Sequence, residues 1–284
     1  MRTSTFGARQ ARSVDAILRH AAVCDDGVMS RILVTGSAQG VGAEASRQLI
    51  EAGHEVVVHG RSDERCREAL RANPDALGAV PGAFDSIAST TAFAQASEAY
   101  APFDVIIHNA AVGPHQDRPV FTQDGLERIF HVNVVSPYLL SCLLPVPQRA
   151  VYVGSDAGQH GSAHFDDLQW DTREWNGMGA YNDSKLYLAM IAMEMAHRHP
   201  GSLVNVVHPG WVQTSMGGAN ALLPVDQGAD SVVWLATSAD AVATTSGQFI
   251  EKRAALKLNP QARDSALRAR LLDELERITG VALP

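Results

Sequence analysis

Tyr181 and Lys185 stand four positions apart in the stretch AYNDSKLYL, and together they could carry acid–base chemistry. If this stretch is helical, one turn brings both side chains to the same face. A tyrosine hydroxyl has an ordinary pKa of about 10, and a close ammonium group would lower it by stabilising the phenolate. Only three of the 23 basic residues are lysine, so this chain, which otherwise uses arginine, places a compact point charge here. An ordinary surface pair on a helix is the alternative.

Short apolar runs rich in valine and isoleucine recur along the chain without alternation, as is typical of strands covered on both faces. Helical patterns lie between them. This order predicts right-handed βαβ crossovers and an α/β fold with a doubly wound parallel sheet, the Rossmann fold, in a single domain. The predicted strands are 31–35, 55–59, 104–108, 150–154 and 203–208, with weaker candidates at 78–82 and 247–250, and the predicted helices include 41–52, 64–72, 122–143, 181–199 and 226–238.

Composition restricts the classes of function. The 284 residues are 46% hydrophobic and 19% charged, which suits a globular rather than a disordered chain. A net charge of −8 argues against nucleic-acid binding, because a phosphate backbone demands a basic face. No apolar run approaches the roughly 18 residues of a membrane span. Cys24, Cys66 and Cys142 lie far apart without a CxxC, which favours reduced thiols in a cytoplasmic protein, and no pattern of metal ligands stands out.

The first 28 residues differ from the rest of the chain. They contain four arginines and no acidic residue before Asp15, and Met29 stands just before the first apolar run. A transit peptide has such a composition, but so does a dispensable extension. We expect residues 1–28 to be a poorly ordered N-terminal extension and residues 29–284 to form one domain.

A glycine-rich turn, TGSAQGVG, follows the first predicted strand and opens the next helix. Dinucleotide binding requires this context, because glycines let the backbone approach a pyrophosphate and the helix N-terminus offers free N–H donors. A tight turn without a ligand is the alternative. The expected cofactor contacts in this segment are Gly36, Ser37, Gln39, Gly40, Val41 and Gly42.

The glycine spacing and the Tyr181–Lys185 pair resemble the short-chain dehydrogenase/reductase family in its single-domain form, whose patterns are TGxxxGxG and YxxxK. Five such motifs follow in the family's order between residue 31 and about residue 260. The segment QHGSAHFDDLQWDTREWNGMGA before Tyr181 is similar to that of retinol-dehydrogenase-like and WW-domain-oxidoreductase-like members. Its Trp170, Trp175 and Met178 could line an apolar substrate pocket or pack the segment down.

The resemblance implies a catalytic set of Asn133, Ser155, Tyr181 and Lys185. Tyr181 would donate a proton to a carbonyl oxygen as hydride arrives from the nicotinamide, and Ser155 would hydrogen-bond the same oxygen. Lys185 would lower the tyrosine pKa and hold the nicotinamide ribose, and Asn133 would position a water in a proton relay. Taken alone, a serine after a strand or an asparagine in a helix is an ordinary structural residue.

Arg61 follows the second predicted strand, where an NAD site commonly offers an acidic residue to the ribose 2′-hydroxyl. A guanidinium can instead hold a 2′-phosphate through two hydrogen bonds, so NADP(H) is favoured over NAD(H) as the cofactor. A solvated arginine that opens the next helix is the alternative.

The remaining family motifs match with small departures. Asn109 corresponds to the NNAG motif beside the adenosine ribose, but Ala111 replaces the motif's glycine. Ala83 stands where the family usually has an adenine-contacting aspartate, and Asp85 could compensate. After a PG turn, the stretch GGANALLPV reads as a mobile lid over the substrate. Further expected cofactor contacts are Tyr181, Lys185, Val212 and Thr214.

These observations predict an NADP(H)-dependent oxidoreductase that transfers hydride between the nicotinamide and a small-molecule carbonyl/alcohol pair. An NAD-linked alcohol dehydrogenase of the same fold and a non-catalytic NADP-sensing protein are the alternatives. The protein could form a homodimer through the helices that carry Asn133 and Tyr181. The sequence does not decide this, because the segment before the tyrosine could block that face.

Overall fold

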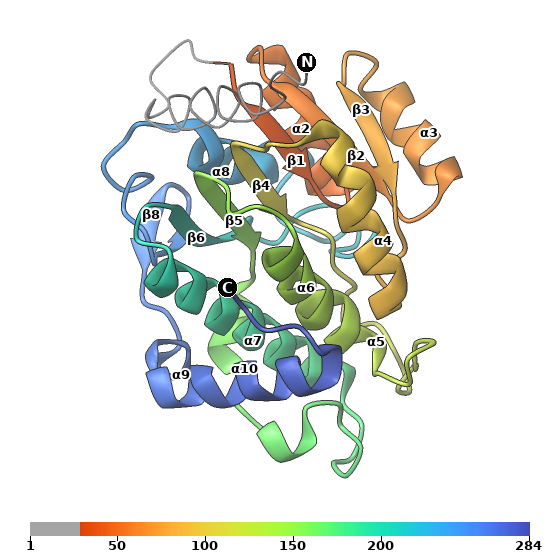
Figure 1. Ribbon diagram of the computed structural model, residues 1–284, viewed down its shortest axis with the longest axis vertical. Coiled ribbons are helices and arrows are strands. Elements are labelled where there is room, and N and C mark those ends of the chain that lie inside the picture. The colour runs from red at the N-terminus through yellow and green to blue at the C-terminus, as the bar shows by residue number, and fades with distance from the viewer. Residues whose placement is uncertain (1–28) are drawn as a thin grey trace, which may run out of the picture.

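The computed structural model describes residues 29–284, so the predictions for residues 1–28 and for Cys24 lie outside the described part of the chain. Eight strands form one sheet in the order β3-β2-β1-β4-β5-β6-β7-β8 (Figure 1). Strands β1 to β7 are parallel, and β8 is antiparallel to β7. The predicted doubly wound sheet is confirmed. The strands are β1 (Arg31–Val34), β2 (Glu55–Gly60), β3 (Gly78–Pro81), β4 (Val105–His108), β5 (Arg149–Val153), β6 (Leu203–His208), β7 (Phe249–Glu251) and β8 (Ala254–Leu256).

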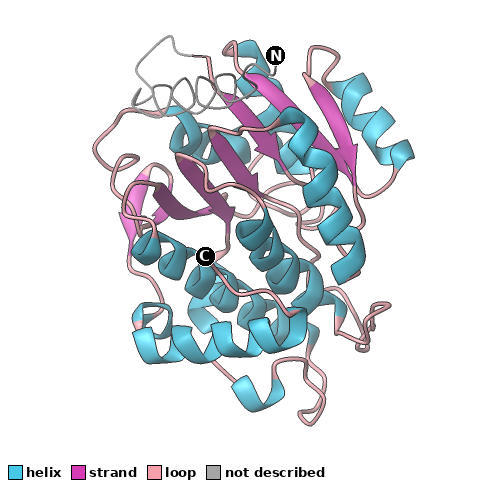
Figure 2. Ribbon diagram, viewed as in Figure 1, coloured by secondary structure: helices cyan, strands magenta, loops and turns pink. Residues whose placement is uncertain are grey.

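Helices cover both faces of the sheet (Figure 2). Helices α2, α3 and α8 pack on one face and α4, α6 and α7 on the other, where α10 forms an outer layer against α7. Within residues 29–284, no helix combines the length and apolar character needed to cross a bilayer. The helices are α2 (Gly40–Glu51), α3 (Asp63–Ala72), α4 (Ile87–Ser97), α5 (Arg128–Phe130), α6 (Ser136–Leu143), α7 (Gly177–Arg198), α8 (Val225–Thr237), α9 (Pro260–Arg263) and α10 (Ser265–Thr279).

The central strands are buried on both faces, as their apolar runs predict. In β1, Ile32 and Val34 pack with α2 and α8 whereas Leu33 packs with α4 and α6, because successive side chains of a strand alternate. Each face of the strand therefore anchors its own layer of helices.

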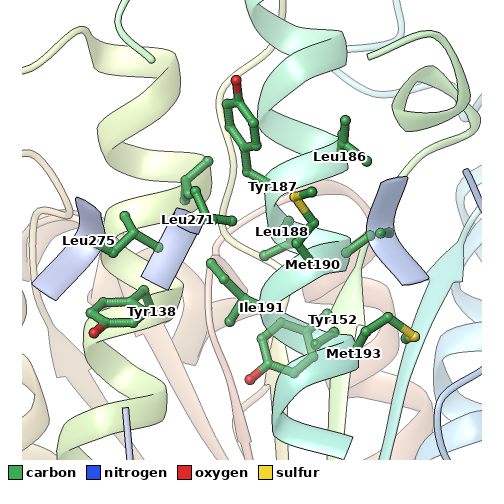
Figure 3. Packing of buried hydrophobic residues seen from close by; sticks show 14 of the residues in the cluster. Tyr138, Tyr152, Leu186, Tyr187, Leu188, Met190, Ile191, Met193, Leu271 and Leu275 are labelled. Carbon is green, nitrogen blue, oxygen red and sulfur yellow. The ribbon is translucent and has the colours of Figure 1, made fainter. Parts of the chain in front are cut away.

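The long helix α7 is held firmly against the sheet. Its apolar residues, such as Ile191, pack with Tyr152 of β5, Tyr138 of α6 and Leu271 of α10 (Figure 3). This packing fixes the position of the helix that carries Tyr181 and Lys185.

The predicted helix at 122–143 is wrong in its first part. Phe121 and Glu127 form an antiparallel bridge around a turn in which Gly125 has a φ of 71°. Helix α5 begins only after Glu127, whose side chain accepts a hydrogen bond from the Phe130 amide, and it continues through a π-helical turn (His131–Val135) into α6. Apolar spacing alone does not reveal a left-handed glycine and a side-chain cap that delay a helix.

His108, at the end of β4, generates a prediction about acid stability. Its ring stacks on Tyr152 with centroids 4.4 Å apart, and burial lowers its pKa to about 3. An unfolded histidine titrates at about pH 6.5, so this residue's contribution to stability is present above that pH and is lost as the pH falls toward the folded value. The unfolding free energy, measured by urea denaturation, should fall in both proteins as the pH is lowered from 7.5 to 5. In His108→Phe this fall should be about 2 kcal/mol smaller than in the wild type.

The matched control is His197→Gln, at the exposed end of α7. It should keep the wild-type dependence of unfolding free energy on pH. Equal pH dependence in His108→Phe and the wild type would contradict the prediction.

Candidate active site

The glycine-rich turn between β1 and α2 is possible only without side chains at three positions. Gly36 and Gly40 have φ of 68° and 60°, in the left-handed region that favours glycine. A Cβ on Gly42 would overlap the side-chain amide of Asn109 and would lie 2.5 Å from the Gly36 carbonyl. The turn and β4 therefore meet at van der Waals distance.

The N-terminus of α2 is open to an anion. Its N-cap residue Gln39 makes no side-chain cap, and the first turn holds no acidic residue. In contrast, α3 is capped by the Ser62 side chain and carries Asp63 and Glu64 in its first turn. Uncapped N–H groups and the positive end of the helix dipole suit a phosphate, so the glycine turn and α2 fit the pyrophosphate of a dinucleotide.

Asn109 braces this turn from β4. Its Nδ2 donates to the carbonyls of Thr35 at 2.9 Å and of Gly36 at 3.1 Å, and its backbone N–H donates to the Thr35 hydroxyl at 2.9 Å. Asn109 thus lies at the predicted cofactor crevice, with its amide hydrogens committed to the turn.

Ser37 and His59 tie the turn to β2. The Ser37 hydroxyl accepts from the His59 backbone N–H at 2.7 Å and donates to the Val34 carbonyl at 2.9 Å, so this predicted contact residue is buried and structural. His59 Nδ1 accepts from the Gly36 amide at 2.7 Å, and Nε2 bonds to the Gly82 carbonyl at 2.8 Å. Burial lowers the pKa of His59 to about 4, which keeps it neutral and able to accept. The sequence prediction missed His59, although it is a polar residue that directly follows three valines in β2.

Two arginines lie near the end of β2. Arg61 is exposed directly after the strand. Arg65, in the first turns of α3, reaches back to the glycine-rich turn, where its Nη2 donates to Gln39 Oε1 at 2.6 Å. Sequence reasoning singled out Arg61 and missed Arg65. Asp85 is half-buried and follows Phe84, whose ring stacks on His59.

The loop after β6 closes against the same turn. A Cβ on Gly40 would lie 3.1 Å from the Thr214 methyl group, and Gln39 Nε2 donates to the Ser215 hydroxyl at 3.0 Å. Val212 is buried and bridges to Leu223. Thr214 therefore lies against the glycine-rich turn, whereas Val212 packs within its own loop and against α8, and the Val41 side chain packs into the core between α2 and the sheet.

Tyr181 and Lys185 lie one turn apart in α7, as predicted, and the hydrogen bond that the ammonium group makes is to a strand carbonyl. Lys185 Nζ is 5.6 Å from the centre of the Tyr181 ring and donates to the Val153 carbonyl at 2.9 Å. Burial lowers the pKa of Lys185 to about 8. The two groups share a face, and the lysine is directed toward the end of β5.

The pKa of Tyr181 is raised to about 12, against the expectation that Lys185 lowers it. Burial is the main cause, a hydrogen bond with the Ser155 hydroxyl opposes it, and the negative charge of Asp156 adds to it. At neutral pH the hydroxyl is therefore protonated. The spacing of the pair is correct, but the predicted effect on acidity is wrong in this structure.

Ser155 lies between Tyr181 and two groups that the sequence prediction missed. Its hydroxyl donates to Asp156 Oδ1 at 3.1 Å and accepts from the Ala157 amide at 3.2 Å. The same Asp156 oxygen is 3.7 Å from Nε2 of His208, the last residue of β6. Burial lowers the pKa of His208, although the Asp156 charge opposes this shift. His208 is the last residue of β6 and Asp156 follows β5 by three residues, so position near a strand end is the signal that the sequence offers.

Asn133 is fully buried in the π-helical turn. Its Oδ1 accepts from the Val112 amide at 2.8 Å, and its Nδ2 donates to the Val112 carbonyl at 3.0 Å and to the Ser184 hydroxyl at 3.1 Å. Both amide hydrogens are used, so the side chain joins the loop after β4 to α7. The predicted role of this amide in ordering a water gains no support from these contacts.

The segment before Tyr181 is held by polar contacts within itself, with α7 and with the loop after β4. The Arg173 guanidinium lies 3.9 Å from the centre of the Trp170 ring and pairs with Asp167 at 2.9 Å and Asp183 at 3.0 Å. Trp175 Nε1 donates to the Gln116 carbonyl at 2.9 Å. Trp170 thus packs the segment down, whereas Met178 is 52% exposed.

The comparisons with known proteins agree with this geometry. The family model described as short chain dehydrogenase matches residues 30–167. The short-chain dehydrogenase chyC of Penicillium rubens is 35% identical over 90% of this chain and 100% of its own length, and human retinol dehydrogenase 13 is 29% identical over 89% and 85%. A solved Mycobacterium paratuberculosis protein, 23% identical, has the same fold with a TM-score of 0.78 over 90% of this chain and 95% of its own.

Fold, glycine-rich turn and Tyr–Lys helix together define an NAD(P)-dependent oxidoreductase built on the Rossmann fold. The chain belongs to the short-chain dehydrogenase/reductase family, and the relatives that it resembles include retinol dehydrogenases.

Asp156→Asn should lower the pKa of Tyr181, because it removes a negative charge that disfavours the phenolate while keeping the Oδ1 acceptor of Ser155. NMR titration of ring-labelled tyrosines measures this, with Tyr181→Phe to assign the signal and circular dichroism to mark the pH range in which the fold persists. Asp166→Asn, fully exposed beside α10, is the matched control. An unchanged or raised Tyr181 pKa in Asp156→Asn would be incompatible with this account.

Proposed function

We propose that this protein is an NADP(H)-dependent reductase of small-molecule carbonyl compounds in which Tyr181 supplies the proton. The observation that carries the proposal is the meeting of Tyr181, Ser155 and Lys185 at the carboxyl end of β5. That edge of the sheet also holds the glycine-rich turn and the open N-terminus of α2. In doubly wound sheets, ligands bind at this edge. A cytoplasmic location and a homodimer stay predictions from the sequence.

Tyr181 is protonated at neutral pH, as a proton donor must be before reaction, but burial raises its pKa to about 12 and so makes it a weaker acid than a free tyrosine. The positive charge of a bound cofactor or of Lys185 would have to offset this effect. Ser155, which hydrogen-bonds Tyr181, would also hydrogen-bond the carbonyl oxygen and stabilise its developing charge. A bound reduced nicotinamide would supply the hydride.

Lys185 has hydrogen-bonding capacity left for the cofactor. An ammonium group has three donors, and one of them is used by the Val153 carbonyl. The remaining donors are free to hold the nicotinamide ribose at the end of β5. Asn133 acts as a positioning residue in this scheme, because it joins α7 to the loop after β4.

The preference for NADP(H) rests on Arg61 and Arg65. Arg61 is exposed directly after β2, and Arg65, in the first turns of α3, pairs with Glu68 and also contacts the glycine-rich turn through Gln39. Two guanidinium groups suit a dianionic phosphate better than a neutral hydroxyl.

Tyr181→Phe should lower turnover with an accepted aldehyde or ketone by roughly a hundredfold or more, because the proton donor is lost. NADPH affinity, measured by fluorescence titration, should stay within about twofold of the wild type, since the ring remains. Tyr100→Phe, beside the first residue of β3 at the opposite edge of the sheet, is the matched control and should keep wild-type turnover. Full activity of Tyr181→Phe would refute the assignment.

Arg61→Ser should weaken NADPH binding by about tenfold or more, because a charge-assisted contact to the phosphate is lost. NADH affinity should change little, and calorimetry with both cofactors tests this difference. Arg67→Ser, exposed on α3, is the matched control. Equal loss of both affinities, or no loss of NADPH affinity, would show that Arg61 does not read the phosphate.

A further inference from the structure

Met216 lies where a substrate carbonyl would bind. It belongs to the loop between β6 and α8, and its Sδ is 3.9 Å from the Tyr181 hydroxyl, which is directed at it. If Tyr181 donates a proton to the substrate, the carbonyl oxygen must take this position next to the hydroxyl. A substrate can therefore react only after the thioether has turned aside.

Met216 is held from the opposite side by the loop after β4. A Cβ on Gly113 would lie 2.7 Å from Met216 Cγ, so the side chain packs directly on the loop backbone. His115 Nε2 lies 3.1 Å from the Met216 carbonyl, within hydrogen-bonding distance. Glycine at position 113 is thus required for the methionine to reach Tyr181.

The loop after β4 is itself fixed. Asn133 bonds both backbone groups of Val112, and Trp175 bonds the Gln116 carbonyl. Met216 therefore packs against a loop whose backbone is held in place by hydrogen bonds.

The backbone around Met216 is fixed as well. Gly217 N–H donates to the Thr214 hydroxyl at 3.0 Å, and the Gly217 carbonyl accepts from Trp211 Nε1 at 2.8 Å. The unbranched methionine side chain can change rotamer without moving this backbone. The movable part is thus the side chain of Met216.

We propose that Met216 determines substrate specificity by limiting the size of the group that flanks the substrate carbonyl. The thioether fills the slot between Tyr181 and the Gly113 backbone, and a substrate shares that slot with the displaced side chain. Aldehydes and ketones with a slim apolar substituent fit beside it, whereas ketones with a bulky ring at the carbonyl carbon do not. This inference rests on the proposed function.

The test compares kcat/KM of Met216→Ala and the wild type on aldehydes and ketones of graded bulk with NADPH. Met216→Ala should raise kcat/KM for aryl ketones by about tenfold or more relative to a small aldehyde, mostly through KM, since roughly three heavy atoms leave the slot. Met216→Leu, which keeps most of the volume, should shift the preference less. Leu222→Ala, 77% exposed on the same loop, is the control and should keep the wild-type order of substrates.

A readout independent of turnover is the titration of ring-labelled Tyr181 by NMR. Removing the thioether lets water reach the hydroxyl, so the pKa should fall below that of the wild type. Unchanged substrate order together with an unchanged Tyr181 titration in Met216→Ala would overturn the inference, while loss of activity in Tyr181→Phe would leave the proposed function standing. The converse result, a changed substrate order with a fully active Tyr181→Phe, would support the role of Met216 and remove that of Tyr181.

Discussion

The contact of Gly42 with the Asn109 amide is the constraint on which the site depends. It joins the turn after β1 to the end of β4, the two strands that lie side by side where the sheet reverses its order. Any side chain at position 42 would push α2 away from β4 and turn its free N–H groups from the crevice. Asn109 completes the junction by bonding the carbonyls of Thr35 and Gly36, so the anion site and the strand ends form one rigid unit.

Burial shifts the pKa values of Tyr181 and Lys185 in opposite directions. It raises the pKa of the phenol and lowers that of the amine, so each neutral form is favoured. At neutral pH the phenol is therefore protonated, and the Lys185 ammonium group spends one of its donors on the Val153 carbonyl at the end of β5.

Much of the fold and part of the site could be predicted because they follow from local patterns. Continuous apolar runs identify β1, β2, β4, β5 and β6, and the glycine and YxxxK spacings identify the two segments that meet at the sheet edge. The features that could not be predicted from the sequence are the orientations of side chains and the contacts between segments that are distant in the chain. Spacing places Lys185 on the face of Tyr181 without showing that its ammonium group bonds a strand carbonyl. His59 and Met216 act through contacts with residues 23 and 35 positions away.

A chain of contacts links the catalytic helix to substrate selection. Asn133 bonds Ser184 in α7 and Val112 in the loop after β4, and the next residue of that loop, Gly113, packs on Met216, which returns to Tyr181 in α7. The segment before Tyr181 joins the chain through Trp175. The same segment is bonded to α7 through Arg173 and Asp183. The walls of the proposed slot thus come from loops outside α7 that are tied to the helix through Asn133 and Arg173, so a change in these loops acts on the slot and on the helix together.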